Sequence, residues 1–205
     1  MIEIIVGLIL LVFLSKDKKE NYSNSLKNIY GTELESCQIY NGDGSGSWDN
    51  EGKCSELGGG VHQICFKLNN NTKDFSSHTG QSNWSQKNRL EDMNKTNNQH
   101  CMCLGAWSLY KAKQEKNQIQ NTEEELVCNA IPEIALSANY INSWSKWNGI
   151  ELPNQIVNGV NSLVKQCHQK ENDNIKKNYL KQKYCNFANT SQSLKNSNLY
   201  TELCL

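Results

Sequence analysis

The stretch Val61-His62-Gln63-Ile64-Cys65-Phe66-Lys67-Leu68 follows three consecutive glycines, Gly58-Gly59-Gly60. A short apolar run after a glycine turn is typical of a β-strand. A second apolar stretch, Cys101 to Tyr110, is too short for periodicity to distinguish a strand from the start of a helix. The polar segment from Asn69 to His100 lies between the two stretches and reads as a long loop.

The surrounding region has a distinctive composition. Residues 28 to 113 contain ten of the thirteen glycines and five of the nine cysteines. Short strands and turns rich in glycine and cysteine predict a small α+β domain over residues 28 to 114.

The character of the chain changes to helical from about Thr122. Thr122-Glu123-Glu124-Glu125 matches a helix-capping pattern and precedes an apolar series that runs to Leu136. Further helices are predicted over 152 to 169, 171 to 186 and 192 to 204, with Pro153 in a first turn, where its missing N–H is harmless. Trp144 and Trp147 are interpreted as packing residues at a domain contact. The predicted fold class is α+β, with residues 115 to 205 forming a helical extension.

The N-terminus is the most apolar part of the chain. Met1 to Leu14 carries one charge, Glu3, and ends at a lysine-rich run that begins after Ser15. Fourteen helical residues reach roughly 21 Å, which is short of a bilayer core of about 30 Å. We interpret residues 1 to 15 as a single-pass membrane anchor and 16 to 27 as a linker. A cleaved secretory signal and a buried element of a soluble protein remain the alternatives.

Charge and composition narrow the functional classes. Lys+Arg and Asp+Glu number 21 each, so the chain lacks the positive field that nucleic-acid binding requires, and no nucleic-acid partner is expected. The mean hydropathy of -0.69 is low. Five Trp, eight Tyr and nine Cys nevertheless indicate a folded, polar-surfaced protein and not a disordered one.

Several motifs in the glycine-rich half resemble a known family. They are Gly31-Thr32-Glu33-Leu34-Glu35-Ser36-Cys37, Gly52-Lys53-Cys54, Gly60-Val61-His62-Gln63-Ile64-Cys65, Phe75-Ser76-Ser77 with Gly80, and Cys101-Met102-Cys103-Leu104-Gly105-Ala106-Trp107. In order and spacing, residues 28 to 113 resemble the family catalogued as domain of unknown function 2237. The resemblance implies a shared fold but no reaction, and the chain after about residue 115 lies outside it.

The sequence departs from the family pattern where a site would be expected. The paired cysteines after the glycine appear here as Lys53-Cys54, His100 stands in place of a tryptophan, and Ala106 in place of an arginine. The resemblance is therefore evidence for the fold more than for an activity.

Cysteines of this half form the candidate site, together with one histidine and one tryptophan: Cys37, Cys54, His62, Cys65, Cys101, Cys103 and Trp107. Three chemistries are open. In the disulfide interpretation, Cys101 and Cys103 each take a partner from the other three cysteines, which leaves one thiol over. In the metal interpretation, thiolates and His62 bind zinc, although no C-x-x-C pair is present. In the third, a reactive thiol uses His62 as its base.

The helical half adds four more cysteines, which we predict form two disulfides: Cys128, Cys167, Cys185 and Cys204. Disulfides imply an oxidising environment. The lysines after the apolar run instead favour a cytoplasmic body under the positive-inside rule. Either the charge signal misleads and the body is lumenal or extracellular, or a dedicated oxidase forms the bridges, as large DNA viruses do for virion membrane proteins.

We therefore expect a non-enzymatic, membrane-anchored structural or interaction protein without a cofactor. Its expected partners are the membrane, through residues 1 to 15, and other membrane or virion proteins. A virion or endomembrane location is expected, and a secreted protein is the alternative. The competing functional hypothesis is a metal-binding module, with zinc as cofactor, or a thiol-dependent enzyme that uses the cysteines and His62.

Overall fold

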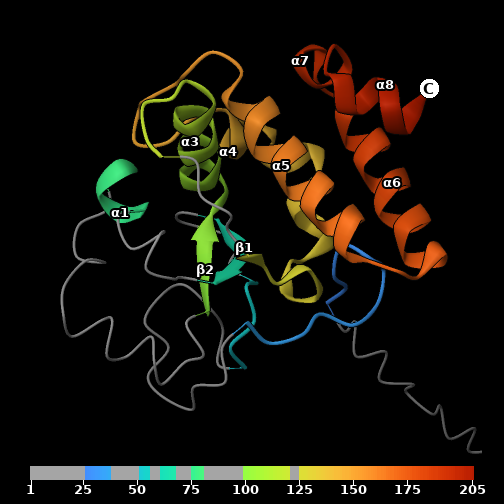
Figure 1. Ribbon diagram of the computed structural model, residues 1–205. Helices are drawn as coiled ribbons and strands as arrows, with labels where there is room; N and C mark the ends of the chain where they lie inside the picture. Colours follow the sequence, from blue (N-terminus) through green and yellow to red (C-terminus); the bar gives the residue numbers. More distant parts are fainter. Residues whose placement is uncertain (1–25, 38–50, 56–60, 68–74, 81–98, 121–124) are drawn as a thin grey trace, which may run out of the picture.

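The computed structural model describes residues 26–37, 51–55, 61–67, 75–80, 99–120 and 125–205 (Figure 1). The predicted anchor at residues 1 to 15, nearly all of the linker, the glycine turn at 58 to 60 and most of the loop from 69 to 100 lie outside these ranges. Within them, no helix has the length and apolar character needed to cross a membrane.

The described residues form a small antiparallel sheet. It contains β1 (His62–Lys67), β2 (Gln99–Cys103) and β3 (Glu125–Leu126), in the order β2-β1-β3. The strand predicted from the central apolar run is confirmed as β1. Its pairing with β2 shifts register between His62 and Ile64, which marks a bulge or irregularity.

The prediction of a helix that begins at the capping pattern Thr122 to Glu125 is wrong. Glu125–Leu126 pairs with β1 as an edge strand, and the backbone N–H of Val127 continues this contact with a hydrogen bond of 3.0 Å to the carbonyl of Cys65. The next residues form short 3-10 turns at Cys128–Ala130, Glu133–Leu136 and Ala138–Tyr140. Pro132 lies among these turns, where its missing N–H prevents a continuous α-helix.

The second apolar stretch contains both a strand and the start of a helix, the two alternatives that its sequence left open. Strand β2 ends at Cys103, and helix α3 (Leu104–Glu115) begins at the next residue. The short helix α1 (Phe75–His78) packs its aromatic ring against α3, with 4.6 Å between the ring centroids of Phe75 and Tyr110. The direct strand-to-helix junction places the residues after Cys103 in the core.

Both tryptophans of the pair at 144 and 147 serve packing. The indole N–H of Trp144, in α4 (Ile141–Ser145), donates to the carbonyl of Ala135 at 2.9 Å. The indole N–H of Trp147 donates to the carbonyl of Thr79 at 2.7 Å. Trp147 therefore connects the segment after α4 to the segment after α1.

The C-terminal helices agree closely with the prediction. They are α5 (Gln155–Lys170), α6 (Asn174–Ala188), α7 (Gln192–Lys195) and α8 (Asn198–Cys204). Polar side chains cap three of them: Asp173 accepts from Ile175 and Lys176, Ser191 from Leu194, and Ser197 from Tyr200. The placement of Pro153 in a first turn is wrong, because Asn154, with a positive φ of 64°, precedes Gln155 as the capping residue.

One continuous core joins the sheet to these helices. In Figure 1, α5 lies between α3 and α6. Gly159 of α5 permits close approach to α3, because a Cβ there would lie 2.2 Å from the Ser108 hydroxyl and 2.8 Å from its Cα. Among the described residues, most buried apolar side chains, from Ile29 in the N-terminal segment to Leu203 in α8, belong to a single cluster. Residues before and after position 115 thus share one mixed α/β structure.

Candidate functional site: a cluster of buried cysteines

The disulfide interpretation of the cysteines is confirmed for eight of them. The bridges are Cys37–Cys65, Cys54–Cys101, Cys128–Cys167 and Cys185–Cys204. Their Cα–Cα distances lie between 5.3 and 5.7 Å, within the usual range for disulfides. The expectation that Cys103 also takes a disulfide partner from this set is wrong, because Cys54 bonds Cys101 and Cys37 bonds Cys65.

Two of these bridges lie side by side on one face of the sheet. Cys65 and Cys101 are directly opposite each other in the β1–β2 ladder, so their side chains project from the same face. Two loop segments bring Cys37 and Cys54 onto that face. The segments are joined by a hydrogen bond of 2.8 Å from the backbone N–H of Cys37 to the carbonyl of Gly52.

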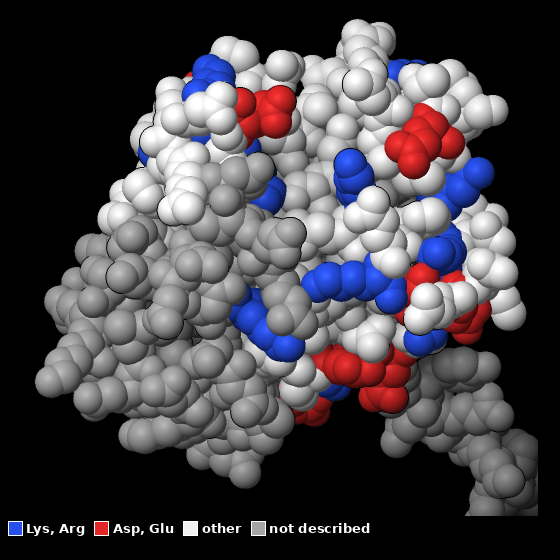
Figure 2. Space-filling model, viewed as in Figure 1, with Lys and Arg blue, Asp and Glu red and all other residues white. Residues whose placement is uncertain are grey.

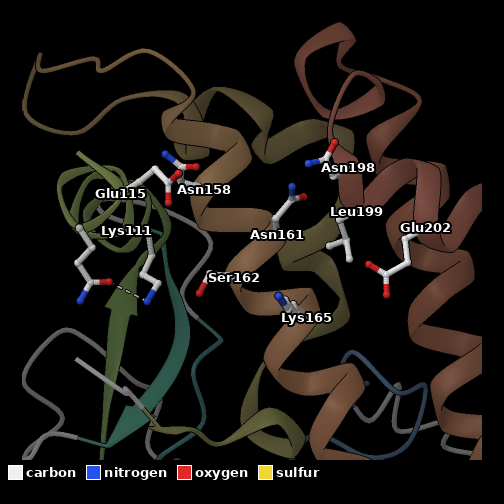
Figure 3. A pocket seen from close by; sticks show the side chains of 10 residues that line it. Lys111, Glu115, Asn158, Asn161, Ser162, Lys165, Asn198, Leu199 and Glu202 are labelled. Atoms are coloured by element: carbon white, nitrogen blue, oxygen red, sulfur yellow. Dashed lines mark hydrogen bonds between the residues drawn. The ribbon is translucent and has the colours of Figure 1, made fainter. Parts of the chain in front are cut away.

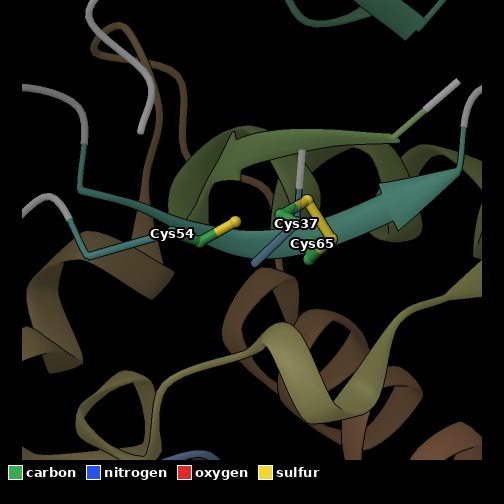
Figure 4. Close-up of side chains that lie close together, drawn as sticks. All are labelled: Cys37, Cys54 and Cys65. Carbon is green, nitrogen blue, oxygen red and sulfur yellow. A yellow bond between two sulfur atoms is a disulfide. The ribbon is translucent and has the colours of Figure 1, made fainter. Parts of the chain in front are cut away.

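Three of these four sulfurs converge, and the fourth is bonded to one of the three. The Sγ atoms of Cys37, Cys54 and Cys65 all lie within 4.8 Å of one another, and Cys101 Sγ is bonded to Cys54 at 2.03 Å. Figure 4 shows Cys54 extending over β1 toward the Cys37–Cys65 bridge. Each of the four residues is at most 1 % exposed. We call these four residues the sulfur cluster.

His62 and Cys103 form the terminal pair of the same ladder. They are Cα partners in β1 and β2, and Cys103 is a buried residue that carries a thiol. His62 is partly exposed. The sequence-derived site therefore divides into a set of bonded sulfurs and a neighbouring pair, Cys103 and His62. The ring nitrogens of His62 do not converge with the sulfurs of Cys37, Cys54 and Cys65.

Trp107 supports the packing between α3 and α5. Its side chain is fully buried, and its indole N–H donates to the carbonyl of Gly159 at 3.0 Å. Its ring meets Phe66 of β1 edge-on, with centroids 5.8 Å apart, and Lys111 Nζ lies 5.2 Å from the ring centroid. Trp107 thus fixes the position of the helix that follows β2.

The two C-terminal bridges differ in burial. Cys128–Cys167 connects the turn after β3 to α5, and both residues are buried. Tyr30 adds a second connection there, because its hydroxyl donates to the carbonyl of Cys167 at 2.8 Å. Burial, with a smaller effect from the negative charge of Glu171, raises the pKa of Tyr30. Cys185–Cys204 joins α6 to α8, and both of its residues are partly exposed.

An open groove of about 550 Å³, which no sequence motif indicated, lies between α3, α5 and α8. Amide and charged side chains line it, among them Asn158, Asn161 and Lys165 of α5, and Glu202 of α8 (Figure 3). At its α3 side, Lys111 Nζ donates to the side-chain oxygen of Gln114 at 2.8 Å. These polar residues are spread over three helices far apart in sequence, so no local motif could reveal them.

Charged side chains of both signs are interspersed over the described part of the face shown in Figure 2.

The partly buried Glu133 forms an ion pair and a hydrogen bond within the fold. Glu133 accepts hydrogen bonds from the Tyr179 hydroxyl and from Lys183 Nζ, the latter at 3.0 Å. Burial alone would raise the pKa of Glu133, but these two donors and the charges of Lys183 and Lys27 outweigh it and lower the pKa.

No protein-family model, curated protein or solved structure matches this chain. The resemblance to domain of unknown function 2237 therefore stays a prediction, and the class of the protein is defined by its own geometry. That class is a mixed α/β, cysteine-rich protein with four disulfides among the described residues.

Proposed function

We propose that this chain is a membrane-anchored structural or interaction protein whose exposed body is held rigid by disulfides. The observation that carries the proposal is the placement of four bridges across the described fold, two at the sheet and two among the helices. Several bridges that connect distant segments are typical of proteins that fold in an oxidising environment and act as stable scaffolds.

The start of the folded body is compatible with a tether. Leu26 is 43 % exposed and Lys27 is also exposed, so the chain enters the body at its surface. Lys27 pairs as a β-bridge with Glu33, and Asn28 with Pro132, which fixes this entry point to the core. An apolar segment of residues 1 to 15 inserted in a bilayer would hold the body without disturbing its packing.

The groove between α3, α5 and α8 is the surface we assign to interaction. Its open, polar lining suits a hydrophilic partner surface more than an apolar small molecule, since small-molecule sites are mostly apolar. Its partner belongs to the class of other membrane or virion proteins. Disulfides formed by a dedicated oxidase would reconcile the bridges with lysines that follow the anchor.

Carbonate extraction combined with non-reducing gel analysis tests the proposal on the native, full-length protein. We expect the chain to stay in the membrane pellet and to migrate faster without reductant than with it. A variant that lacks residues 1 to 15, made in the same cells, should move to the soluble fraction.

The matched control keeps the segment and removes a bridge. The double variant Cys185→Ser and Cys204→Ser should remain in the membrane pellet, because anchoring and oxidation are separate properties. Recovery of the intact, uncleaved chain in the soluble fraction, unchanged by loss of residues 1 to 15, would overturn the anchoring proposal. A chain with nine reactive thiols in its native compartment would overturn the scaffold proposal.

A further inference from the structure

We propose that reduction of its two bridges converts the sulfur cluster into a thiolate site for a divalent metal ion of the zinc type. The oxidised cluster stabilises the fold, and the reduced cluster binds the metal. This inference goes beyond the scaffold function, because it assigns a second state to Cys37, Cys54, Cys65 and Cys101.

The positions of the sulfurs carry the inference. A tetrahedral zinc ion bound at about 2.3 Å from each sulfur places its ligands about 3.8 Å apart. Cys54 Sγ already lies within 4.8 Å of both Cys37 Sγ and Cys65 Sγ. Within each bridge the sulfurs start 2.02 or 2.03 Å apart and must separate. Shifts of about 2 Å are within reach of side-chain rotation about Cα–Cβ.

The backbone that holds the four ligands does not depend on the sulfur–sulfur bonds alone. Cys65 and Cys101 are fixed by the β1–β2 ladder. Cys37 is connected to the segment of Cys54 by its hydrogen bond to Gly52, and the Ser36 hydroxyl donates to the carbonyl of Glu51 at 2.6 Å. The segment that ends at Cys37 is also joined to the rest of the fold by a hydrogen bond of 2.9 Å from the backbone N–H of Ile29 to the carbonyl of Ile131. These contacts keep the four ligands near one face of the sheet after reduction.

The chemistry balances with a phosphine reductant. Two phosphine molecules reduce the two disulfides with four electrons, each phosphine takes the oxygen of one water molecule to become a phosphine oxide, and four thiols form that ionise to four thiolates when they bind the metal. One divalent ion then binds all four thiolates, and the protons of the thiols go to solvent. Reoxidation reverses the step: two sulfur–sulfur bonds form, four electrons leave to the oxidant, and the metal is released.

Cobalt(II) is the probe for this site because tetrahedral thiolate coordination gives it visible absorption. Full-length protein is treated with a phosphine reductant, which does not compete as a thiol ligand, and is titrated with Co²⁺ while circular dichroism follows the fold. We expect one equivalent to bind with sulfur-to-cobalt charge-transfer bands, and Zn²⁺ to displace it. The oxidised protein should show no such bands.

Matched variants separate the cluster from the other cysteines. Cys54→Ser should weaken Co²⁺ binding by about tenfold or more, because a ligand is lost. The double variant Cys185→Ser and Cys204→Ser removes two thiols from a bridge between α6 and α8 and should bind as the parent does.

Three results would overturn the proposal. They are no charge-transfer bands with reduced protein, equal binding by Cys54→Ser and the parent, and a reduced chain that stays unfolded whether or not metal is present. None of these depends on membrane fractionation, so failure here leaves the anchored-scaffold function to its own test.

Discussion

Cys65 and Cys101 are direct partners across the β1–β2 ladder, yet each is bonded to a cysteine from a loop and not to the other. The strands need no bridge, because their backbone hydrogen bonds already join them. The two bonds instead fasten the segments that contain Cys37 and Cys54 onto the sheet.

The first prediction compares the contributions of two disulfides to the stability of the protein. Cys54–Cys101 closes a separation of 47 residues and Cys185–Cys204 one of 19. Loop-closure entropy then assigns about 4 kcal/mol to the first and about 3 kcal/mol to the second. Replacing Cys54 and Cys101 with alanine should lower the thermal midpoint more than the same change at Cys185 and Cys204. Equal shifts in thermal denaturation would contradict this ranking.

The second prediction tests the close approach of α3 and α5. Gly159→Ala places a methyl group against Ser108, which should destabilise the protein by about 1–3 kcal/mol even though alanine favours helices. Asn158→Ala, at the adjacent and partly exposed position, should change stability by no more than about 0.5 kcal/mol. Denaturant unfolding measures both. A Gly159→Ala protein as stable as the parent would show that the two helices separate without cost.

The third prediction concerns Trp107. Phenylalanine keeps an aromatic ring in the core but removes the donor to the Gly159 carbonyl, so Trp107→Phe should cost about 1–3 kcal/mol. Tyr200→Phe loses an exposed hydrogen bond of 2.9 Å to Asn189 and should cost less than about 0.5 kcal/mol. Chemical unfolding of both variants in parallel measures the two losses of stability. Equal losses would contradict the prediction that the buried hydrogen bond of Trp107 contributes more than the exposed hydrogen bond of Tyr200.

The fourth prediction is a dependence of stability on acid. The folded-state pKa of Glu133 is lowered, so the stabilisation from its carboxylate is present above the unfolded-state pKa. It is lost as the pH falls through the folded-state value. Glu133→Gln should therefore destabilise the protein at neutral pH and make its free energy of unfolding depend less on pH in the acidic range. Tyr179→Phe, which removes one donor, should reduce this dependence only in part. The same dependence of the free energy of unfolding on acidic pH in all three proteins would refute the assignment.

The fifth prediction is the alkaline counterpart. Burial, followed by the hydrogen bond to Glu133 and its negative charge, raises the pKa of Tyr179 to about 12. The protonated phenol therefore contributes stability below its unfolded-state value, and this contribution disappears as the pH rises toward about 12. Thermal midpoints of the parent should fall over that range more steeply than those of Tyr179→Phe. Ultraviolet titration of the phenolate in each protein provides the independent measurement.

Local patterns were sufficient for several elements. The run from Val61 to Leu68 contains β1, and the three C-terminal helical predictions lie within a few residues of α5, α6 and the α7–α8 pair. These predictions succeed because apolar periodicity and glycine turns report on neighbouring residues. The capping pattern at Thr122 gave a wrong prediction for the complementary reason: its last residue, Glu125, and the following Leu126 pair with a strand more than fifty positions earlier in the chain.

The sequence by itself determined the mixed α/β class, the helical character of the C-terminal half and the presence of disulfides, since composition and short-range spacing encode these. Only the tertiary structure decided which sulfurs bond, why Cys103 lies outside a disulfide, and where the polar groove opens between α3, α5 and α8. The reason is geometric. Bond formation and groove shape depend on distances of a few ångströms between segments that sequence places tens of residues apart, and packing sets those distances.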